Sequence, residues 1–204
     1  MGFICEDINP ECFSVDDLNL ILFSVLSNIF PDKLDLTQIA MKSFARAAPI
    51  TGRNFLVPEQ KIFIMDKLFL AGEINDEDIL SSLMEALNDI VKNSYDCIGD
   101  QIQRIGNLTI QLINSDHDKP AKLAIEVWSS FAEVEMSRNA QGMPHLGILT
   151  NCLESILEII LTGLRKFDQE TQDENLDEMP ENSLTVAAGY TLENITRVVG
   201  NAIL

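Results

Sequence analysis

Basic and aromatic residues are both scarce in this chain of 204 residues. It has 14 lysines and arginines against 32 aspartates and glutamates, so its formal net charge is -18, and aromatics make up 6% of it. The average field of such a chain repels nucleic acid and anionic membrane surfaces and attracts basic protein segments. The charge balance therefore argues against a nucleic-acid-binding protein and favours a basic protein as partner.

Long apolar runs are missing as well. No uninterrupted apolar stretch approaches the roughly 20 residues that a membrane-spanning helix needs. Glu6 and Asp7 interrupt the first apolar residues, which argues against a signal peptide. The four cysteines stand at positions 5, 12, 97 and 152 without a CxxC pair. We expect the cysteines to be small buried residues of a reducing compartment, with neither a disulfide nor a zinc site. We also expect no segment of the chain to insert into a membrane.

Motifs of catalysis are also absent from the sequence. It contains neither a glycine-rich phosphate loop nor an HExxH motif. His117 and His145 lie in or next to expected turns, and no serine or cysteine pairs convincingly with either as nucleophile and base. We therefore predict no enzymatic activity, no metal and no cofactor.

Helical periodicity is present almost everywhere, whereas alternating β-branched runs are missing. Helices are predicted at Asp16–Phe30, Leu36–Ala48, Pro58–Ala71, Asp76–Asn93, Tyr95–Asn114, Pro120–Glu135, Gly147–Phe167 and Ser183–Leu204. They follow one another in pairs with a period of about 40 residues, which is typical of HEAT repeats. The predicted fold class is all-α, a right-handed superhelical solenoid whose repeats cover approximately 12–50, 56–93, 95–136 and 146–204.

Two insertions lengthen the last part of the chain, Ser137–His145 and an acidic segment at 168–182. The acidic segment contains Asp173, Glu174, Asp177 and Glu178 and no basic residue. Because like charges repel at this density, we expect a solvated loop. It either meets a basic partner or serves solubility alone. It lacks the glycine and the alternating ligand spacing of an EF-hand, so calcium is not predicted.

The first and third predicted helices carry more apolar residues than one packing stripe requires. A solenoid helix that contacts only its neighbours needs an apolar arc of roughly 100°. The excess either forms a shallow groove for a ligand or serves packing between repeats. Trp128 could likewise be either a binding anchor at an interface or a residue that packs within the repeat. Its apolar neighbours favour packing.

Both ends of the sequence resemble the interior of a longer array. Met1–Cys5 has the pattern of the last turn of a helix, and the final helix ends on apolar residues 202–204. Solenoids normally close with polar capping repeats. We expect the chain to be a piece of a longer solenoid.

Several stretches carry a family resemblance. Gly2-Phe-Ile-Cys-Glu-Asp-Ile-Asn-Pro-Glu11 is close to a Gly-Tyr-Ile-Cys-Gln-Asp-Ile-Asp-Pro-Glu stretch of the importin beta family of nuclear import receptors. The stretches Ile62–Met65 and Leu123–Trp128, with Glu133 and Glu135, and the acidic segment follow in the same order and at nearly the same spacing. The chain thus resembles a central piece of such a receptor over essentially its whole length.

The resemblance implies three classes of partner. Phenylalanine-glycine (FG) repeats of nucleoporins would bind outer helices at Ile21, Val25, Phe63 and Ile64. Asp173, Glu174, Asp177 and Glu178 would face the GTPase Ran and importin alpha or a basic cargo. The protein would then occur in the cytoplasm and nucleus and at the nuclear pore. The alternative is a structural HEAT scaffold, as in phosphatase assemblies, with Ile21 and Phe63 buried.

Overall fold

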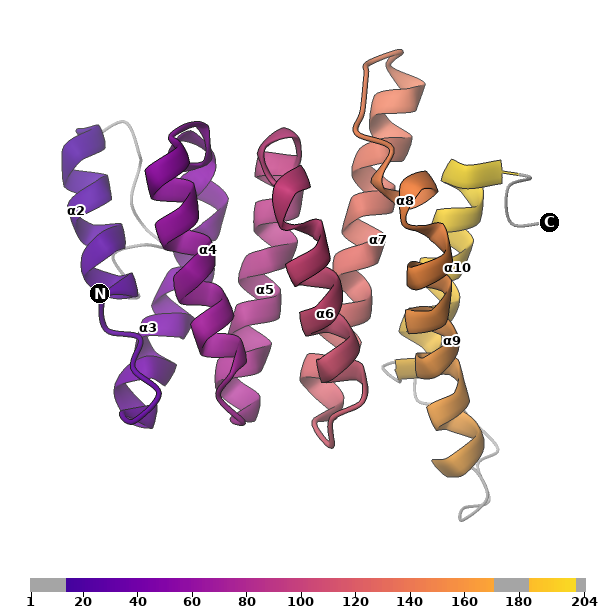
Figure 1. Ribbon diagram of the computed structural model, residues 1–204, viewed down its shortest axis with the longest axis horizontal. Coiled ribbons are helices and arrows are strands. Elements are labelled where there is room, and N and C mark those ends of the chain that lie inside the picture. Colours follow the sequence, from indigo (N-terminus) through magenta and orange to yellow (C-terminus); the bar gives the residue numbers. More distant parts are fainter. Residues whose placement is uncertain (1–13, 171–183, 201–204) are drawn as a thin grey trace. The chain divides into compact units, whose positions relative to one another are not determined.

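The computed structural model describes residues 14–170 and 184–200, and these residues are helical apart from short connections (Figure 1). They form two compact units, Met1–Cys97 and Ile98–Leu204. No described helix is both long and apolar enough to cross a lipid bilayer.

Unit 1 is built from two helix pairs. The pairs are α2 (Val15–Leu26) with α3 (Leu34–Ala47), and α4 (Pro58–Gly72) with α5 (Glu77–Ser94). A 3-10 segment, η2 (Ala48–Leu56), connects the pairs, and η3 (Tyr95–Cys97) follows α5. Helix α2 packs on α3, α4 packs on α5, and the two second helices α3 and α5 lie side by side.

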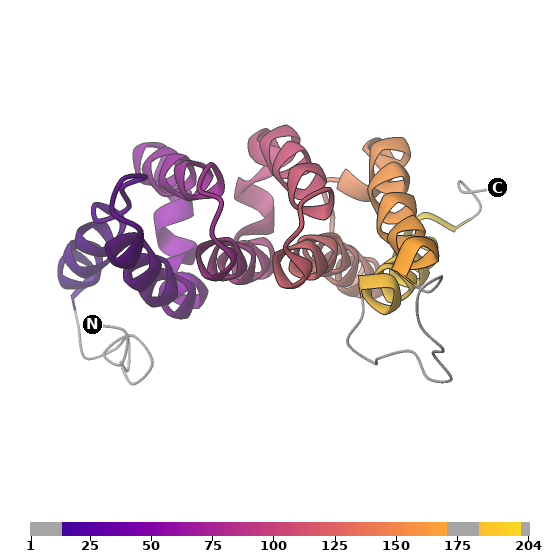
Figure 2. The ribbon, with the colours of Figure 1, turned by 90° about the horizontal axis from the view of Figure 1, so that it is seen from below.

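Unit 2 begins with η4 (Gly99–Gln101) and continues with α6 (Ile102–Ile113) and α7 (Asp118–Ala140). A second pair follows, made of the short α8 (Ile148–Asn151), α9 (Leu153–Glu170) and α10 (Leu184–Val199). Helices α6 and α9 form one layer and α7 and α10 the other (Figure 2). Each helix thereby buries its apolar face against both a partner and a neighbour.

Helix boundaries follow local chemistry where a cap is present. Ser14 accepts a hydrogen bond from the Asp17 amide, and the Asp17 carboxylate accepts one from the Ser14 amide, which forms a capping box at the start of α2. Asp76 caps α5 by accepting from the Ile79 amide at 3.0 Å. Pro58 opens α4 at the position where the missing N–H costs nothing, as predicted.

Several of the predicted helices end or break at other residues than predicted. Helix α2 ends at Leu26, before the predicted Phe30, and the Asn28 side chain donates to the Ser24 carbonyl, which competes with continued helix. The segment predicted as helix from Tyr95 is broken into η3 and η4 before α6 starts at Ile102, because Tyr95 and Ile98 are buried there. The helix predicted at Gly147–Phe167 is interrupted at Cys152.

The two predicted insertions are partly helical. Helix α7 continues to Ala140 and so includes the first residues of Ser137–His145. Helix α9 continues to Glu170, so the first residues of the acidic segment are helical and not loop. Helical hydrogen bonding outweighs local charge and polarity at these helix ends. The remainder of the acidic segment up to 182 lies outside the described residues.

A buried carboxylate holds the connection between α7 and α8. Glu135 is 0% exposed, and its Oε1 accepts a hydrogen bond from the backbone amide of Ile148 at 2.7 Å. Its Oε2 lies 3.6 Å from Nδ1 of His145, which itself accepts a hydrogen bond from the Gly147 amide at 3.1 Å. The start of α8 is thereby tied to the middle of unit 2.

Helix α9 approaches α7 closely at Gly163. A Cβ placed on Gly163 would lie 2.6 Å from Ile125 Cδ1 of α7 and 3.6 Å from Ala188 Cβ of α10. Gly163→Val is expected to lower the free energy of unfolding by about 1–3 kcal/mol because the added atoms overpack the site. Gly163→Ala is expected to be nearly neutral, since Ile125 can shift and alanine favours helix by about 1 kcal/mol. Urea denaturation measures both.

Gly189 provides the matched control for this prediction. It lies in α10, is exposed, and a Cβ there would meet nothing within 4 Å. Gly189→Ala should therefore stabilise the chain by up to about 1 kcal/mol. If Gly163→Val were as stable as the parent, α9 would not approach α7 this closely.

The two cysteines among the described residues are not buried as predicted. Cys97 and Cys152 are both free thiols and both half-exposed. Each lies beside a break between helices. Cys5 and Cys12 lie outside the described residues.

Candidate functional site

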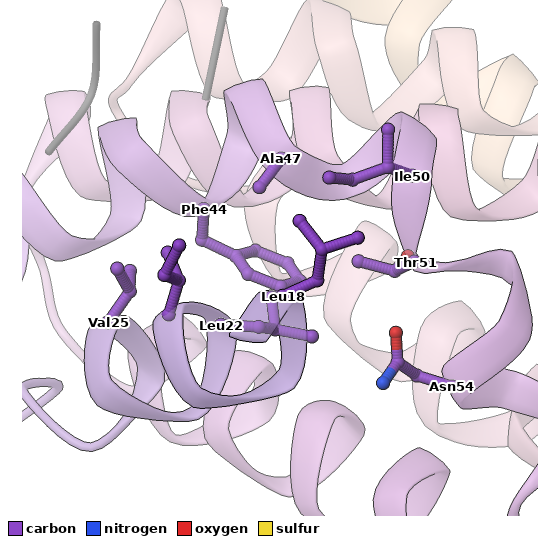
Figure 3. Close-up of a pocket in the computed structure, with 9 residues that line it drawn as sticks. Leu18, Leu22, Val25, Phe44, Ala47, Ile50, Thr51 and Asn54 are labelled. Atoms are coloured by element: carbon purple, nitrogen blue, oxygen red, sulfur yellow. The ribbon is translucent and has the colours of Figure 1, made fainter. Parts of the chain in front are cut away.

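An apolar pocket opens in unit 1 between α2, α3 and η2 (Figure 3). The cavity itself measures about 30 Å³, and the wider hollow around it is open to solvent. Its lining consists of Leu18, Ile21, Leu22 and Val25 from α2, Phe44 and Ala47 from α3, and Ile50, Thr51 and Asn54 from η2. The four α2 residues recur at helical spacing and therefore share one face. Its lining offers mainly carbon atoms to a ligand, and only a small part of the hollow is enclosed.

Two of the predicted nucleoporin-binding residues line this pocket, and two do not. Ile21 is half-buried and Val25 is largely buried in its wall. Phe63 of α4 instead packs edge-on against Phe23 of α2, with ring centroids 5.2 Å apart at an interplanar angle of 78°. Ile64 is 0% exposed and belongs to the core of unit 1. The structure therefore does not gather the four predicted residues in one pocket.

Sequence reasoning singled out neither Phe23 nor the residues from α3 and η2. Phe23 stands two positions from Ile21 and from Val25, which turns it by about 200° around a helix to the flank that meets α4. The helical period of the sequence therefore indicated that Phe23 faces another neighbour than Ile21 and Val25 do. Phe44 and Ile50 join the pocket from 19 or more residues further along the chain, so no local pattern could have assigned them.

A hydrogen-bonded asparagine, Asn54, lies at one end of the pocket. The side chain of Asn54 is 7% exposed, and its Nδ2 donates to Asn19 Oδ1 of α2 at 2.6 Å and to Gln60 Oε1 of α4 at 2.9 Å. The hydroxyl of Thr51 donates to the Ala48 carbonyl at 2.7 Å. Asn54 thus links two helices beside an otherwise apolar pocket.

A second hollow lies in unit 2 between α6 and α9. Trp128 and Ile156 form its apolar floor, and Gln103, Asn107 and Asn151 are among its polar lining residues. Trp128 is 2% exposed and its indole nitrogen donates to Thr109 Oγ1 at 3.2 Å. The prediction that Trp128 serves packing is confirmed.

Helix α5 of unit 1 carries the exposed Glu85 and the half-buried Asp89 one turn apart. Burial raises the pKa of Asp89 on α5, Glu85 one turn earlier raises it further, and Lys92 opposes the shift. The predicted partner-facing residues Asp173, Glu174, Asp177 and Glu178 lie outside the described residues, and their role remains a prediction.

Residues with catalytic potential do not form a site among the described residues. His145 is held near Glu135, with Nδ1 and Oε2 at 3.6 Å, and the backbone amide of His117 donates to Ser115 Oγ at 3.3 Å. In the parts of the chain that the structure describes, no group of three or more histidine, cysteine or acidic residues could hold a metal ion.

The chain is similar to importin subunit beta-1 of several organisms over its whole length. It is 24% identical to the protein of Arabidopsis thaliana, 25% to that of Schizosaccharomyces pombe and 21% to that of Saccharomyces cerevisiae. In each case 100% of this chain matches and 24% of the relative is covered, so the chain spans about a quarter of these relatives. No protein-family model matches it.

The solved structures that resemble the chain are also importin beta proteins or Kap95. A crystal structure of importin beta in an ammonium sulfate condition matches 100% of the chain with a TM-score of 0.85 at 22% identity. Kap95p bound to RanGDP matches with a TM-score of 0.83, and a Kap95:Nup1 complex with 0.84, both at 19% identity and both over the whole chain. The chain covers 24% of each of these proteins. The predicted resemblance to importin beta and the all-α HEAT-repeat fold class are confirmed.

Proposed function

We propose that this chain is a segment of a nuclear transport receptor of the importin beta type, which acts by binding other proteins and not by catalysis. The observation that carries the proposal is the similarity of the whole chain, in sequence and in fold, to importin beta proteins and to Kap95. The supporting structures include Kap95 complexes with RanGDP and with Nup1. We propose a protein that moves between cytoplasm and nucleus through the nuclear pore.

We further propose that the apolar pocket of unit 1 binds phenylalanine side chains of FG nucleoporin repeats. Ile21 and Val25 in its wall are two of the residues at which the resemblance to importin beta implied such contacts. Burial of one phenylalanine supplies about 1.5–3 kcal/mol before ordering costs, which gives weak binding. Weak contacts that are repeated along a multivalent partner combine affinity with rapid exchange, as transit through a pore requires.

Basic partners belong to the same proposal. The formal net charge of -18 attracts the basic surface of a protein such as Ran, importin alpha or a basic cargo, and more strongly at low salt. We propose that Asp173, Glu174, Asp177 and Glu178 contribute to this attraction. Replacing the four by amides should weaken the binding of a basic partner at low salt and reduce the salt dependence.

A titration with an FG nucleoporin peptide, followed by NMR of the labelled 204-residue chain, tests the pocket. The parent chain is expected to bind weakly and saturably, and Ile21→Asp to bind at least about tenfold more weakly because a charge replaces part of the apolar wall. Leu20→Asp is the matched control: Leu20 is 70% exposed and does not line the pocket. Its affinity should stay within about twofold of the parent value.

Phe63→Ala decides between the pocket and the α2–α4 contact. Phe63 packs on Phe23 outside the pocket lining, so its truncation should leave peptide affinity unchanged if the pocket is the site. A loss of binding in Phe63→Ala but not in Ile21→Asp would move the site to the groove between α2 and α4. A folded parent that binds no FG peptide would favour the HEAT scaffold instead.

A further inference from the structure

Helices α6 and α9 of unit 2 leave a groove between them. The second helices of the two pairs, α7 and α10, pack along much of their length, whereas α6 and α9 touch over a smaller part of theirs. Because α7 lies in the other layer (Figure 2), its Trp128 forms the floor of this groove. Gly106 of α6 contributes no side chain over that floor, and a Cβ there would stand 3.9 Å from Trp128 Cζ2. The groove is therefore open down to the second layer.

Two hollows lie along this groove. The larger, which we call the Trp128 hollow, measures about 550 Å³ and falls within the usual size range of ligand pockets. The smaller, which we call the Glu158 hollow, measures about 110 Å³. The Glu158 hollow is lined by Ile110, Ile113, Asn114, Glu158, Ile159 and Thr162. Ile110 and Ile159 line both hollows, so the two form one continuous surface.

The formal charges that line the two hollows are all negative. Asp100 of η4 lines the Trp128 hollow, and Glu158 of α9 lines the other. Glu158 is exposed, and no ion pair is found for it among the described side chains. Arg104, the basic residue that follows Asp100 in sequence, donates to Gln101 Oε1 at 3.3 Å and lines neither hollow. The groove thus combines an apolar floor with carboxylates and no basic group.

We propose that this groove binds a basic segment of a partner protein that carries a large apolar residue at its centre. The apolar side chain occupies the Trp128 hollow, and a lysine or arginine of the same segment pairs with Glu158. Ile156 in the first hollow and Thr162 in the second are six helical positions apart, which is about 9 Å. Three residues of extended chain span about 10 Å. The basic residue therefore stands about three positions from the apolar one.

The two kinds of contact have different roles in this proposal. Burial of the apolar side chain supplies most of the affinity, because exposed ion pairs each contribute little. The carboxylates select the sign of the charge that flanks it, and their effect weakens as salt screens it. An FG repeat carries no such charge. This inference goes beyond the proposed function, and it does not depend on FG binding by the pocket of unit 1.

A peptide that contains neither phenylalanine nor tryptophan tests the groove by NMR of the labelled 204-residue chain. In Lys-Gly-Ser-Leu-Ser-Gly-Lys a basic residue stands three positions to either side of the leucine. The chain has one tryptophan, so the indole N–H of Trp128 gives a single reporter signal. We expect the peptide to shift this signal saturably. An analogue with glutamine in place of both lysines should bind about twofold to fivefold more weakly at low salt, and the difference should vanish at high salt.

Three variants locate the contacts. Glu158→Gln should remove most of the preference for the lysine peptide over its glutamine analogue. Glu154→Gln is the matched control, since Glu154 is an exposed acid of the same helix that lines neither hollow, and it should retain the preference. Gly106→Leu places a large side chain over Trp128 and should weaken both peptides at least about tenfold. Circular dichroism checks that the helices of each variant are intact.

Several results would overturn the inference. These are equal binding of the two peptides by the parent at low salt, an unmoved Trp128 signal at millimolar lysine peptide, and an equal loss of preference in Glu154→Gln and Glu158→Gln. A Trp128 signal that responds to an FG peptide but not to the lysine peptide would assign the groove to another ligand. If Gly106→Leu does not fold, the comparison of Glu158→Gln with Glu154→Gln decides. Absence of FG binding in unit 1 contradicts only the proposed function.

Discussion

Trp128→Ala is expected to lower the free energy of unfolding of unit 2 by about 3–5 kcal/mol, the range for truncating a buried tryptophan. Trp128 of α7 is 2% exposed and lies against α6, where a Cβ on Gly106 would stand 3.9 Å from its Cζ2. It also packs on Phe131, with ring centroids 5.5 Å apart. Urea denaturation followed by far-ultraviolet circular dichroism measures the loss.

Trp128→Phe separates the volume of the side chain from its hydrogen bond. Phenylalanine keeps much of the apolar contact but leaves Thr109 Oγ1 without the indole donor, which stands 3.2 Å away in the parent. We expect a smaller loss than in Trp128→Ala, about 1–2 kcal/mol. In the double variant with Thr109→Val, part of that loss should disappear. A loss below about 1 kcal/mol in Trp128→Ala would contradict the close packing of α6 and α7.

Glu135→Ala is expected to cost unit 2 about 3 kcal/mol, because it removes the acceptor of a buried backbone N–H together with a buried carboxylate. The amide concerned belongs to Ile148, the first residue of α8, and donates to Glu135 Oε1 at 2.7 Å. A carboxylate at a helix N-terminus also interacts favourably with the helix dipole. Hydrogen exchange of the Ile148 amide should accelerate as its protection is lost.

Glu135→Gln is the matched control for the carboxylate. A glutamine retains an oxygen for the Ile148 amide and removes the charge that faces His145 at 3.6 Å. We expect it to retain more than half of the stability that Glu135→Ala loses. His145→Ala should cost less than Glu135→Ala, since His145 is half-exposed and its contact is longer. If the amide of Ile148 exchanged equally slowly in Glu135→Ala, the carboxylate would not be holding this connection.

The helical fold was predictable because its signals are local. Apolar residues at helical spacing, Pro58 at a helix start and Asp76 at a cap can each be recognised within one or two turns of chain. Where a side chain hydrogen-bonds backward, as Asn28 does to Ser24, the prediction placed the end of α2 too late. Tertiary burial of Tyr95 and Ile98 likewise broke a helix that periodicity alone continued.

The candidate site was predictable only in part. Ile21 and Val25 were expected at a binding surface, and they line the pocket of unit 1. Phe63 and Ile64 were grouped with them, although the structure places one against Phe23 and the other in the core. A run of apolar residues shows that a helix has more than one apolar face. It does not identify which neighbouring helix meets each face.

By itself, the sequence determined the acidic charge, the helical composition, the pairing of successive helices and the resemblance to importin beta. These properties depend on residue types and on spacings within a few turns. Only the tertiary structure decided which flank of α2 opens into a pocket, and that Asn54 joins α2 and α4 at one end of it. Both hydrogen bonds of Asn54 have partners in other elements, Asn19 and Gln60, and hydrogen bonds between residues remote in sequence exist only after the helices have packed.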